Sequence, residues 1–147
     1  MTPPGLVTSW CKPRQNNYRK EVQIMQKESR FIFKPFPYTN EYEGYLTINE
    51  YSVNSRPAIQ LYYYESEYGF YMPYAMLTVN IPSEETTDRN CVFIDTNNCP
   101  WALNLLVNEL KCAEITGHVA HSGRCYYSEV RLILDELFKY VPYNEGR

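Results

Sequence analysis

The chain has 147 residues, of which 44% are hydrophobic and 21% charged, a composition typical of one soluble globular domain. No apolar run approaches the roughly 18 residues that a membrane-spanning helix needs, and the first residues lack the charged start and apolar core of a secretory signal. The five cysteines are odd in number and show no CxxC spacing, so we expect free thiols instead of a disulfide scaffold. These features exclude collagen, coiled coils and membrane proteins, and they favour a cytoplasmic protein.

Charge and tyrosine are both distributed unevenly. Residues 1–34 carry seven basic and two acidic side chains, a net charge of +5, whereas the rest of the chain has a net charge of −8. The 15 tyrosines outnumber the 6 phenylalanines and 2 tryptophans, a bias that suits half-exposed sheets and contact surfaces. We therefore divide the chain into a basic leader, residues 1–34, and a single domain, residues 35–147.

The leader is the first predicted segment. Residues 1–16 mix proline, glycine and polar residues, which predicts an extended conformation, and residues 17–28 permit a short amphipathic helix. Residues 30–37 are β-rich, but two prolines confine them to a sheet edge or a strand end. The positive charge has two interpretations: a solvated terminus, or a nucleic-acid contact through Lys12, Arg14, Arg19 and Lys20.

The clearest strand signals follow between residues 44 and 82. In the first of them, Leu46 and Ile48 lie on one face and Tyr45 and Thr47 on the other, the alternation of a half-buried strand. An antiparallel meander accounts for this region. Its expected elements are a strand at 44–53, a turn at 54–57, a strand at 58–64, a hairpin loop at 65–69, and a strand at 70–81 that Pro73 interrupts early.

The last third of the chain predicts helices and one buried strand. The expected elements are a polar loop at 83–90, a strand at 91–95, a helix from Pro100 to about Cys112 that Asn97 or Asn98 caps, and a glycine-bearing loop at 118–124. Residues 130–141 have helical spacing with Ser128 as a cap, and a strand over 125–134 is the alternative. The predicted fold is α+β, with a small antiparallel sheet and one or two helices packed on one face.

Candidate metal and catalytic residues match no recognised motif. Soft zinc ligands occur at Cys99, Cys112, His118, His121 and Cys125, but only the two histidines are close in sequence, which argues against a zinc site. A Cys/His nucleophile pair oriented by Asp95 lacks any catalytic signature, and residues 95–98 instead predict a side-chain-to-backbone turn. The isolated glycines build neither a GxGxxG fingerprint nor a P-loop. We expect no metal, no cofactor and no enzymatic activity.

The strongest candidate for a binding surface is the acidic and aromatic stretch 41–74, which contains five glutamates, one arginine and nine tyrosines. Exposed tyrosines make good interface anchors, and clustered carboxylates complement a basic surface on a partner. The alternative is a two-sided sheet whose tyrosines pack in the core. The predicted partner contacts are Glu41, Glu43, Glu65, Glu67, Tyr62, Tyr64 and Tyr68.

The middle of the chain, roughly residues 45–127, resembles the family called domain of unknown function 4313. The residues that carry this resemblance are AIQL at 58–61, YAMLTVNIP at 74–82, FIDTNN at 93–98 with Pro100 and Trp101, Thr116-Gly117, and Ser122-Gly123 ahead of Cys125-Tyr126. The chain departs from the family at Tyr126-Tyr127, where the family has Tyr-Pro, and the leader before Tyr38 is not part of the family pattern. The family supplies no catalytic residue to carry over.

The resemblance implies a genomic setting, because this family consists of small uncharacterised proteins of phages and conjugative elements in gut bacteria. Small accessory proteins in that setting often bind and block a bacterial defence protein such as a CRISPR nuclease. The expected function is therefore an anti-CRISPR or anti-restriction inhibitor that occludes a basic surface in the cytoplasm of the bacterial host. The alternative is a nucleic-acid-associated accessory factor of a mobile element that uses the basic leader.

Overall fold

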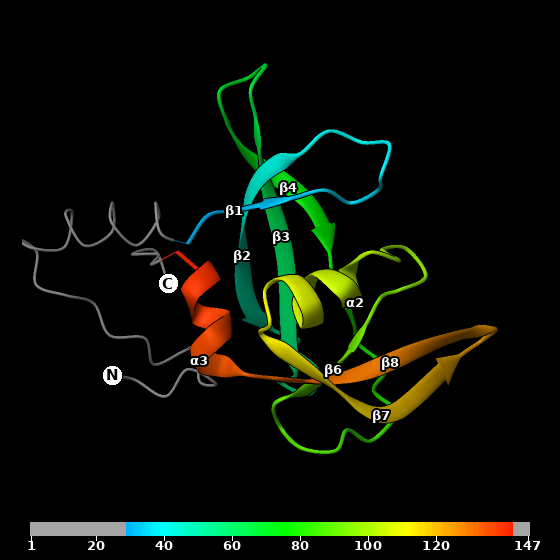
Figure 1. The fold of residues 1–147 in the computed structure, drawn as a ribbon. Coiled ribbons are helices and arrows are strands. Elements are labelled where there is room, and N and C mark those ends of the chain that lie inside the picture. The colour runs from blue at the N-terminus through cyan, green and yellow to red at the C-terminus, as the bar shows by residue number, and fades with distance from the viewer. Residues whose placement is uncertain (1–28, 143–147) are drawn as a thin grey trace, which may run out of the picture.

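Two four-stranded antiparallel sheets form the protein in a computed structural model that describes residues 29–142 (Figure 1). The first sheet has the order β1-β2-β3-β4 and the second the order β5-β6-β8-β7. The strands are β1 (Phe31–Phe33), β2 (Tyr42–Glu50), β3 (Pro57–Glu65), β4 (Phe70–Met76), β5 (Thr78–Val79), β6 (Cys91–Ile94), β7 (Ala113–Ser122) and β8 (Cys125–Leu132). The helical segments are α2 (Ala102–Asn104), the π-helical η2 (Leu105–Glu109), α3 (Leu134–Leu137) and the 3-10 turn η3 (Phe138–Tyr140).

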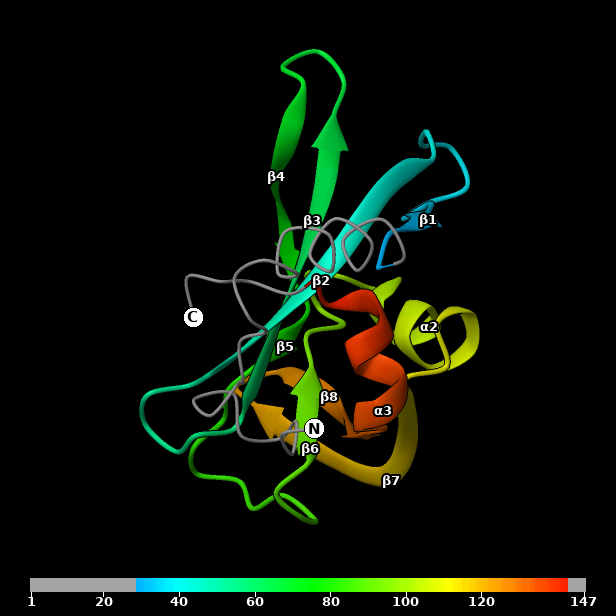
Figure 2. The ribbon, with the colours of Figure 1, turned by 90° about the vertical axis from the view of Figure 1, so that its left-hand side faces the viewer.

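The predicted α+β fold with an antiparallel meander is confirmed in β2, β3 and β4, although the sequence did not indicate a second sheet. Leu46 and Ile48 of β2 are buried, and Leu46 pairs with Leu61 of β3. The β3–β4 hairpin projects beyond the other elements in both ribbon views (Figures 1 and 2). β1 is a short edge strand beside β2. The expectations for residues 1–28, including the contacts at Lys12, Arg14, Arg19 and Lys20, lie outside the described residues.

The expected third strand, 70–81, is divided between the two sheets at Leu77. β4 ends at Met76, and the fully buried Leu77 donates its N–H to the carbonyl oxygen of Ile59, at 2.9 Å. The carbonyl oxygen of Leu77 accepts the N–H of Asp95 at 2.8 Å, and Thr78–Val79 then pair with β6 as β5. Leu77 therefore connects the two sheets by both of its backbone hydrogen bonds.

The expected loop at 118–124 is wrong, because residues 118–122 belong to β7 and only Gly123 and Arg124 form the turn before β8. The strand continues past Gly117 because this residue adopts φ +95° at an irregularity between Ile115 and Val119, a conformation that glycine adopts without strain. The strand alternative holds for β8, Cys125–Leu132, and the helical alternative holds only from Leu134 onward. Ser128 consequently lies within a strand and caps nothing.

The helix predicted from Pro100 begins later, at Ala102. Trp101 is its N-cap residue and provides no side-chain hydrogen bond, so the expected cap at Asn97 or Asn98 is wrong. The carboxylate of Asp95 instead accepts the backbone N–H of Asn98 at 3.3 Å and its side-chain amide at 2.9 Å. Asn98 is used in the turn before the helix, as the predicted Asp95–Asn98 turn requires.

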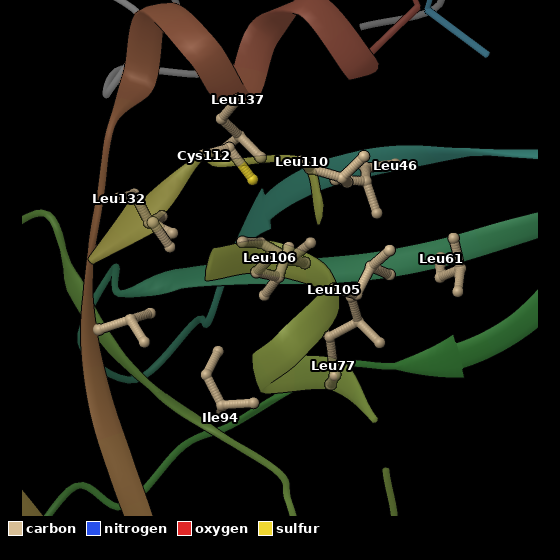
Figure 3. Packing of buried hydrophobic residues seen from close by; sticks show 14 of the residues in the cluster. Leu46, Leu61, Leu77, Ile94, Leu105, Leu106, Leu110, Cys112, Leu132 and Leu137 are labelled. Atoms are coloured by element: carbon tan, nitrogen blue, oxygen red, sulfur yellow. The ribbon is translucent and has the colours of Figure 1, made fainter. Parts of the chain in front are cut away.

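The main hydrophobic core lies between the two sheets, and the helices close it on one face of the first sheet (Figures 2 and 3). Leu105 and Leu106 of η2 and Leu137 of α3 belong to the same buried cluster as Leu46 and Leu61 of the first sheet (Figure 3). The second sheet contributes Ile94 and Leu132 to the same cluster. Among the described residues, 29–142, no helix packs on the opposite face of β2, β3 and β4.

Candidate functional site

The tyrosines of the first sheet divide between its two faces. Tyr42, Tyr63 and Tyr74 are partly buried against the main core, where they pack with Phe33 and Trp101. The ring centroids of Tyr63 and Tyr74 are 5.3 Å apart, and those of Phe33 and Tyr74 are 5.5 Å apart, both in edge-to-face geometry. For these three tyrosines the core interpretation is correct.

The other face carries a row of four tyrosines, Tyr45, Tyr62, Tyr64 and Tyr71, which we call the outer tyrosine face. Tyr45 pairs directly with Tyr62, and Tyr64 with Tyr71, so their side chains share one side of the sheet. The rings of Tyr45 and Tyr62 are stacked at 5.2 Å and 6°, and the Tyr71 ring lies 5.0 Å from that of Tyr45 and 5.2 Å from that of Tyr64. Tyr64 is 41% exposed, so the row is open at this end.

Glu43 and Arg30 meet on this face beside Tyr71. The hydroxyl of Tyr71 donates to Oε2 of Glu43 at 2.5 Å, and Nη1 of Arg30 lies 3.3 Å from the same oxygen. The Arg30 guanidinium also lies over the Tyr71 ring, 5.0 Å from its centroid. Burial and the hydrogen bond to Glu43 raise the pKa of Tyr71, so its hydroxyl stays protonated and continues to donate.

A shallow hollow of about 430 Å³ brings together four of the seven predicted partner contacts, Glu41, Glu43, Tyr64 and Glu65. It opens between the start of β2 and the end of β3, with Asn40, Tyr42 and Ser66 completing its wall. Three carboxylates around one hollow make this the acidic end of the first sheet. We call the hollow and the adjoining loop 66–69 the acidic hairpin.

The remaining predicted contacts are near the tip of the hairpin, except for Tyr62 on the outer tyrosine face. Tyr68 is 61% exposed and stacks on Phe70, which is 55% exposed, at 5.9 Å. Glu67 is also exposed. The carboxylate of Glu65 accepts hydrogen bonds from the hydroxyl of Tyr63, at 2.9 Å, and from the backbone N–H of Glu67, at 3.2 Å. Glu65 therefore shapes the loop.

Sequence reasoning missed Tyr45, Tyr71, Phe70 and Arg30 as members of this surface. The strand alternation and the hairpin register indicate Tyr45 and Tyr71, because both lie across the strands from predicted contacts. Arg30 was counted with the leader, and only the short strand β1 brings it across β2 to Glu43.

The predicted cysteine and histidine candidates are not brought together. Cys99 is buried and donates its thiol to the carbonyl oxygen of Met76, and burial raises the pKa of the buried Cys112 thiol to about 12. His118 Nε2 lies 3.1 Å from the carbonyl oxygen of Glu85, and the His121 ring packs on Tyr126 instead. Within residues 29–142, no three histidine, cysteine or acidic side chains are placed to hold a metal ion.

One fully buried carboxylate, Glu129 of β8, was not anticipated. Its oxygens accept the N–H of Thr87 at 2.8 Å, the hydroxyl of Thr87 at 2.5 Å and the hydroxyl of Thr116 at 2.6 Å. Burial alone would raise its pKa, but these hydrogen bonds and His118 hold the pKa below the ordinary value. Glu129 joins the loop 83–90 to β7 and is closed to a ligand.

These observations define the class of protein as an α+β domain of two antiparallel sheets that presents an acidic, tyrosine-lined surface. The sequence profile described as Domain of unknown function (DUF4313) matches residues 45–145, more than half of the chain, and the chain therefore belongs to this family, as the resemblance indicated. Comparison with curated proteins and with solved structures finds no match. In the described part of the chain, no helix has the length and apolar character required to cross a membrane.

Proposed function

We propose that this protein is an interaction protein that binds a basic surface of a partner protein through the acidic hairpin and the outer tyrosine face. The observation that carries the proposal is the hollow where Glu41, Glu43 and Glu65 meet beside the exposed ring of Tyr64. Carboxylates at a rim steer a basic partner and fix its orientation, and tyrosine rings supply contact area at a small entropy cost. The projection of the β3–β4 hairpin allows this surface to enter a groove (Figure 2).

The chemistry of this surface favours a protein partner over nucleic acid. Four tyrosine rings on a sheet could stack with bases, but the carboxylates beside them repel phosphates. The alternative, an accessory factor that binds nucleic acid through Lys12, Arg14, Arg19 and Lys20, depends on the leader and stays a separate prediction. It requires a steep salt dependence and loss of binding when residues 1–20 are deleted.

The partner class we propose is a bacterial defence effector, such as a CRISPR nuclease or a restriction enzyme. Such an effector must present a cationic surface to hold its nucleic acid, and an acidic protein surface competes for that site without any catalytic step. Membership of the family and the mobile-element setting expected for it support this choice. Inhibition by occlusion also requires neither a cofactor nor a metal.

The test measures whether the immobilised full chain retains purified CRISPR and restriction effectors. Each effector sample is divided, and one half is treated with nuclease before binding. Any effector that is retained is then tested in a cleavage assay. The variant is Glu41→Lys combined with Glu67→Lys, because Glu43 and Glu65 make hydrogen bonds within the sheet. The matched control is Glu114→Lys, a charge reversal on the exposed edge strand β7. We expect the double variant to weaken binding about tenfold or more and the control to bind normally.

Three results would contradict this proposal. Equal retention of an effector by the double variant and the parent would remove the acidic hairpin as the contact. Retention that disappears after nuclease treatment would favour the leader and nucleic acid. Binding of no effector in either half would reject the proposed partner class.

A further inference from the structure

The outer tyrosine face already holds one cationic side chain of this chain, Arg30. Its guanidinium lies 5.0 Å from the centroid of the Tyr71 ring and 3.3 Å from a carboxylate oxygen of Glu43. A ring face for cation–π contact and a carboxylate for a charge-assisted hydrogen bond are the two elements that recognise a guanidinium. The hydroxyl of Tyr71 donates to the same carboxylate oxygen and so joins the two elements.

We propose that the outer tyrosine face binds arginine side chains of the partner, and that Arg30 occupies one of these positions when the partner is absent. The inference rests on the proposed function and names the chemistry of the partner surface. The occupant is an arginine-rich protein segment. The other positions are the rings of Tyr45 and Tyr64, which contact Tyr71 directly, and the ring of Tyr62, which contacts Tyr45.

Arginine fits this surface better than lysine does. A planar guanidinium stacks on a tyrosine ring while its N–H groups, which lie in the guanidinium plane, remain free to reach a carboxylate beside the ring, whereas an ammonium is a more strongly hydrated point charge. The stacked pair Tyr45–Tyr62 provides flat ring area for such stacking. Glu41 and Glu43 line the adjoining hollow and offer carboxylates to neighbouring cations.

Arg30 is placed so that a partner can replace it. The side chains of Arg30 and Glu43 are 38% and 40% exposed, and an ion pair this open to water contributes little net stability. A partner arginine can therefore take over the carboxylate and the ring of Tyr71 at small cost. Arg30 then acts as an internal competitor that lowers the affinity of the face for its partner.

The experiment titrates the full chain with an oligo-arginine peptide and with an oligo-lysine peptide of the same length, at one ionic strength, by calorimetry. Because the two peptides carry the same charge, general attraction to the acidic surface cancels in the ratio of their affinities. We expect the oligo-arginine peptide to bind about tenfold more tightly. A single-stranded RNA oligomer serves as the third ligand, and we expect it not to bind to this face.

Variants place the discrimination on the outer tyrosine face. Tyr62→Leu keeps an apolar side chain but removes a ring, and we expect it to lose most of the preference for arginine. Tyr126→Leu, at a 69% exposed tyrosine of β8, is the matched control and retains the preference. Arg30→Ala raises the affinity for oligo-arginine about threefold because it removes the competitor. Arg30→Lys keeps the charge, and we expect it to raise the affinity for oligo-arginine as well. It replaces Arg30→Ala in the experiment if the alanine variant does not fold.

Equal affinities for the two peptides would overturn the inference, as would a lower affinity of both Arg30 variants for oligo-arginine. RNA binding that Tyr62→Leu abolishes would also overturn it, because the face would then bind bases. The peptide measurement needs no effector, so its outcome is separate from that of the proposed function. Arginine preference without effector binding would reject only the partner class, and effector binding without arginine preference would reject only this inference.

Discussion

At the scale of single residues, Glu129 is the side chain whose environment has the clearest energetic consequence. Glu129 is fully buried, and its carboxylate accepts three hydrogen bonds. The donors are the backbone N–H of Thr87 and the hydroxyls of Thr87 and Thr116. A buried carboxylate satisfied in this way keeps its charge. The loop 83–90 is consequently anchored to β7 and β8 through one side chain.

We predict that Glu129→Gln lowers the free energy of unfolding by about 2 kcal/mol at pH 7. The substitution replaces one carboxylate oxygen by an NH2 group, which cannot accept the hydrogen bonds that Thr87 and Thr116 donate. The pKa of Glu129 is lower in the folded protein than its ordinary value of 4.5, so its stabilisation is complete above that value and is lost as the pH falls through the folded pKa. The difference between variant and parent should therefore shrink below pH 4.5. Urea denaturation at several pH values measures it.

The exposed Glu114→Gln substitution on β7 is the control for this measurement, and we expect a change within about 0.5 kcal/mol at every pH. A constant difference between Glu129→Gln and the parent from neutral to acid pH would show that the carboxylate is not the charged acceptor. Equal stability of the two at neutral pH would show that the Thr87 and Thr116 bonds contribute nothing.

At the scale of elements, Gly44 allows β2 to lie close both to β3 and to the Phe33 ring of β1. A Cβ atom at this buried position would meet the backbone carbonyl of Tyr62 and lie 2.7 Å from a ring carbon of Phe33, the residue that joins β1 to the core. The backbone at Gly44 does not have a positive φ, so the requirement is for space and not for a special conformation.

We predict that Gly44→Ala lowers the free energy of unfolding by about 2 kcal/mol, the usual cost of overpacking a core. Gly123→Ala is the matched control, because at φ +61° it meets backbone strain but no atom within 4 Å, and we expect about 1 kcal/mol. Urea denaturation compares the two variants. A cost at Gly44 equal to or below that at Gly123 would mean that the Phe33 ring and the Tyr62 carbonyl both move aside freely.

The strands that follow simple alternation could be predicted from the sequence, and the irregular elements could not. β2 and β3 each bury alternate residues, such as Leu46 and Leu61, so the period-two pattern identified them. Polar residues and Gly123 predict a loop at 118–124, but residues 118–122 continue β7, and Gly117 accommodates an irregularity within that strand. Alternation also continues through Leu77, and sequence periodicity does not show that the chain changes sheets there.

The candidate site was predicted only in part, for a similar reason. Glutamate and tyrosine enrichment indicated Glu41, Glu43 and Tyr64, which the structure places around one hollow. Composition does not reveal which face of a sheet a tyrosine occupies, so the division between inner and outer tyrosines depended on the register. Contacts such as that of Arg30, just before β1, with Glu43 of β2 join residues that are distant in sequence, and local patterns contain no signal for them.

At the scale of the whole molecule, the two sheets share one core, and Leu77 lies where they meet. Its side chain is fully buried in the cluster that contains residues of both sheets and of the helices. Its backbone also bonds to Ile59 of the first sheet and to Asp95, which follows β6 of the second. Neither sheet has a separate core of comparable size, so the described region should unfold as one cooperative unit.

We predict that Leu77→Ala lowers the free energy of unfolding by about 3 kcal/mol, the cost of a cavity in a well-packed core, and that unfolding remains a single transition. Trp101, which packs on Phe33 and Tyr74, reports the first sheet by fluorescence once Trp10→Phe removes the other tryptophan. Far-UV circular dichroism reports the two sheets together. The urea midpoints measured by fluorescence and by circular dichroism should coincide, both in the parent and in the variant.

Met76→Ala is the neighbouring control, because Met76 is 41% exposed and its replacement should cost less than about 1 kcal/mol. Two separated transitions in the parent would show that the sheets are independent units and that the shared core does not couple them. Coincident midpoints in the parent that separate only in Leu77→Ala would instead identify Leu77 as the main coupling residue. In that case the coupling of the two sheets depends on the point where the chain passes from β4 to β5.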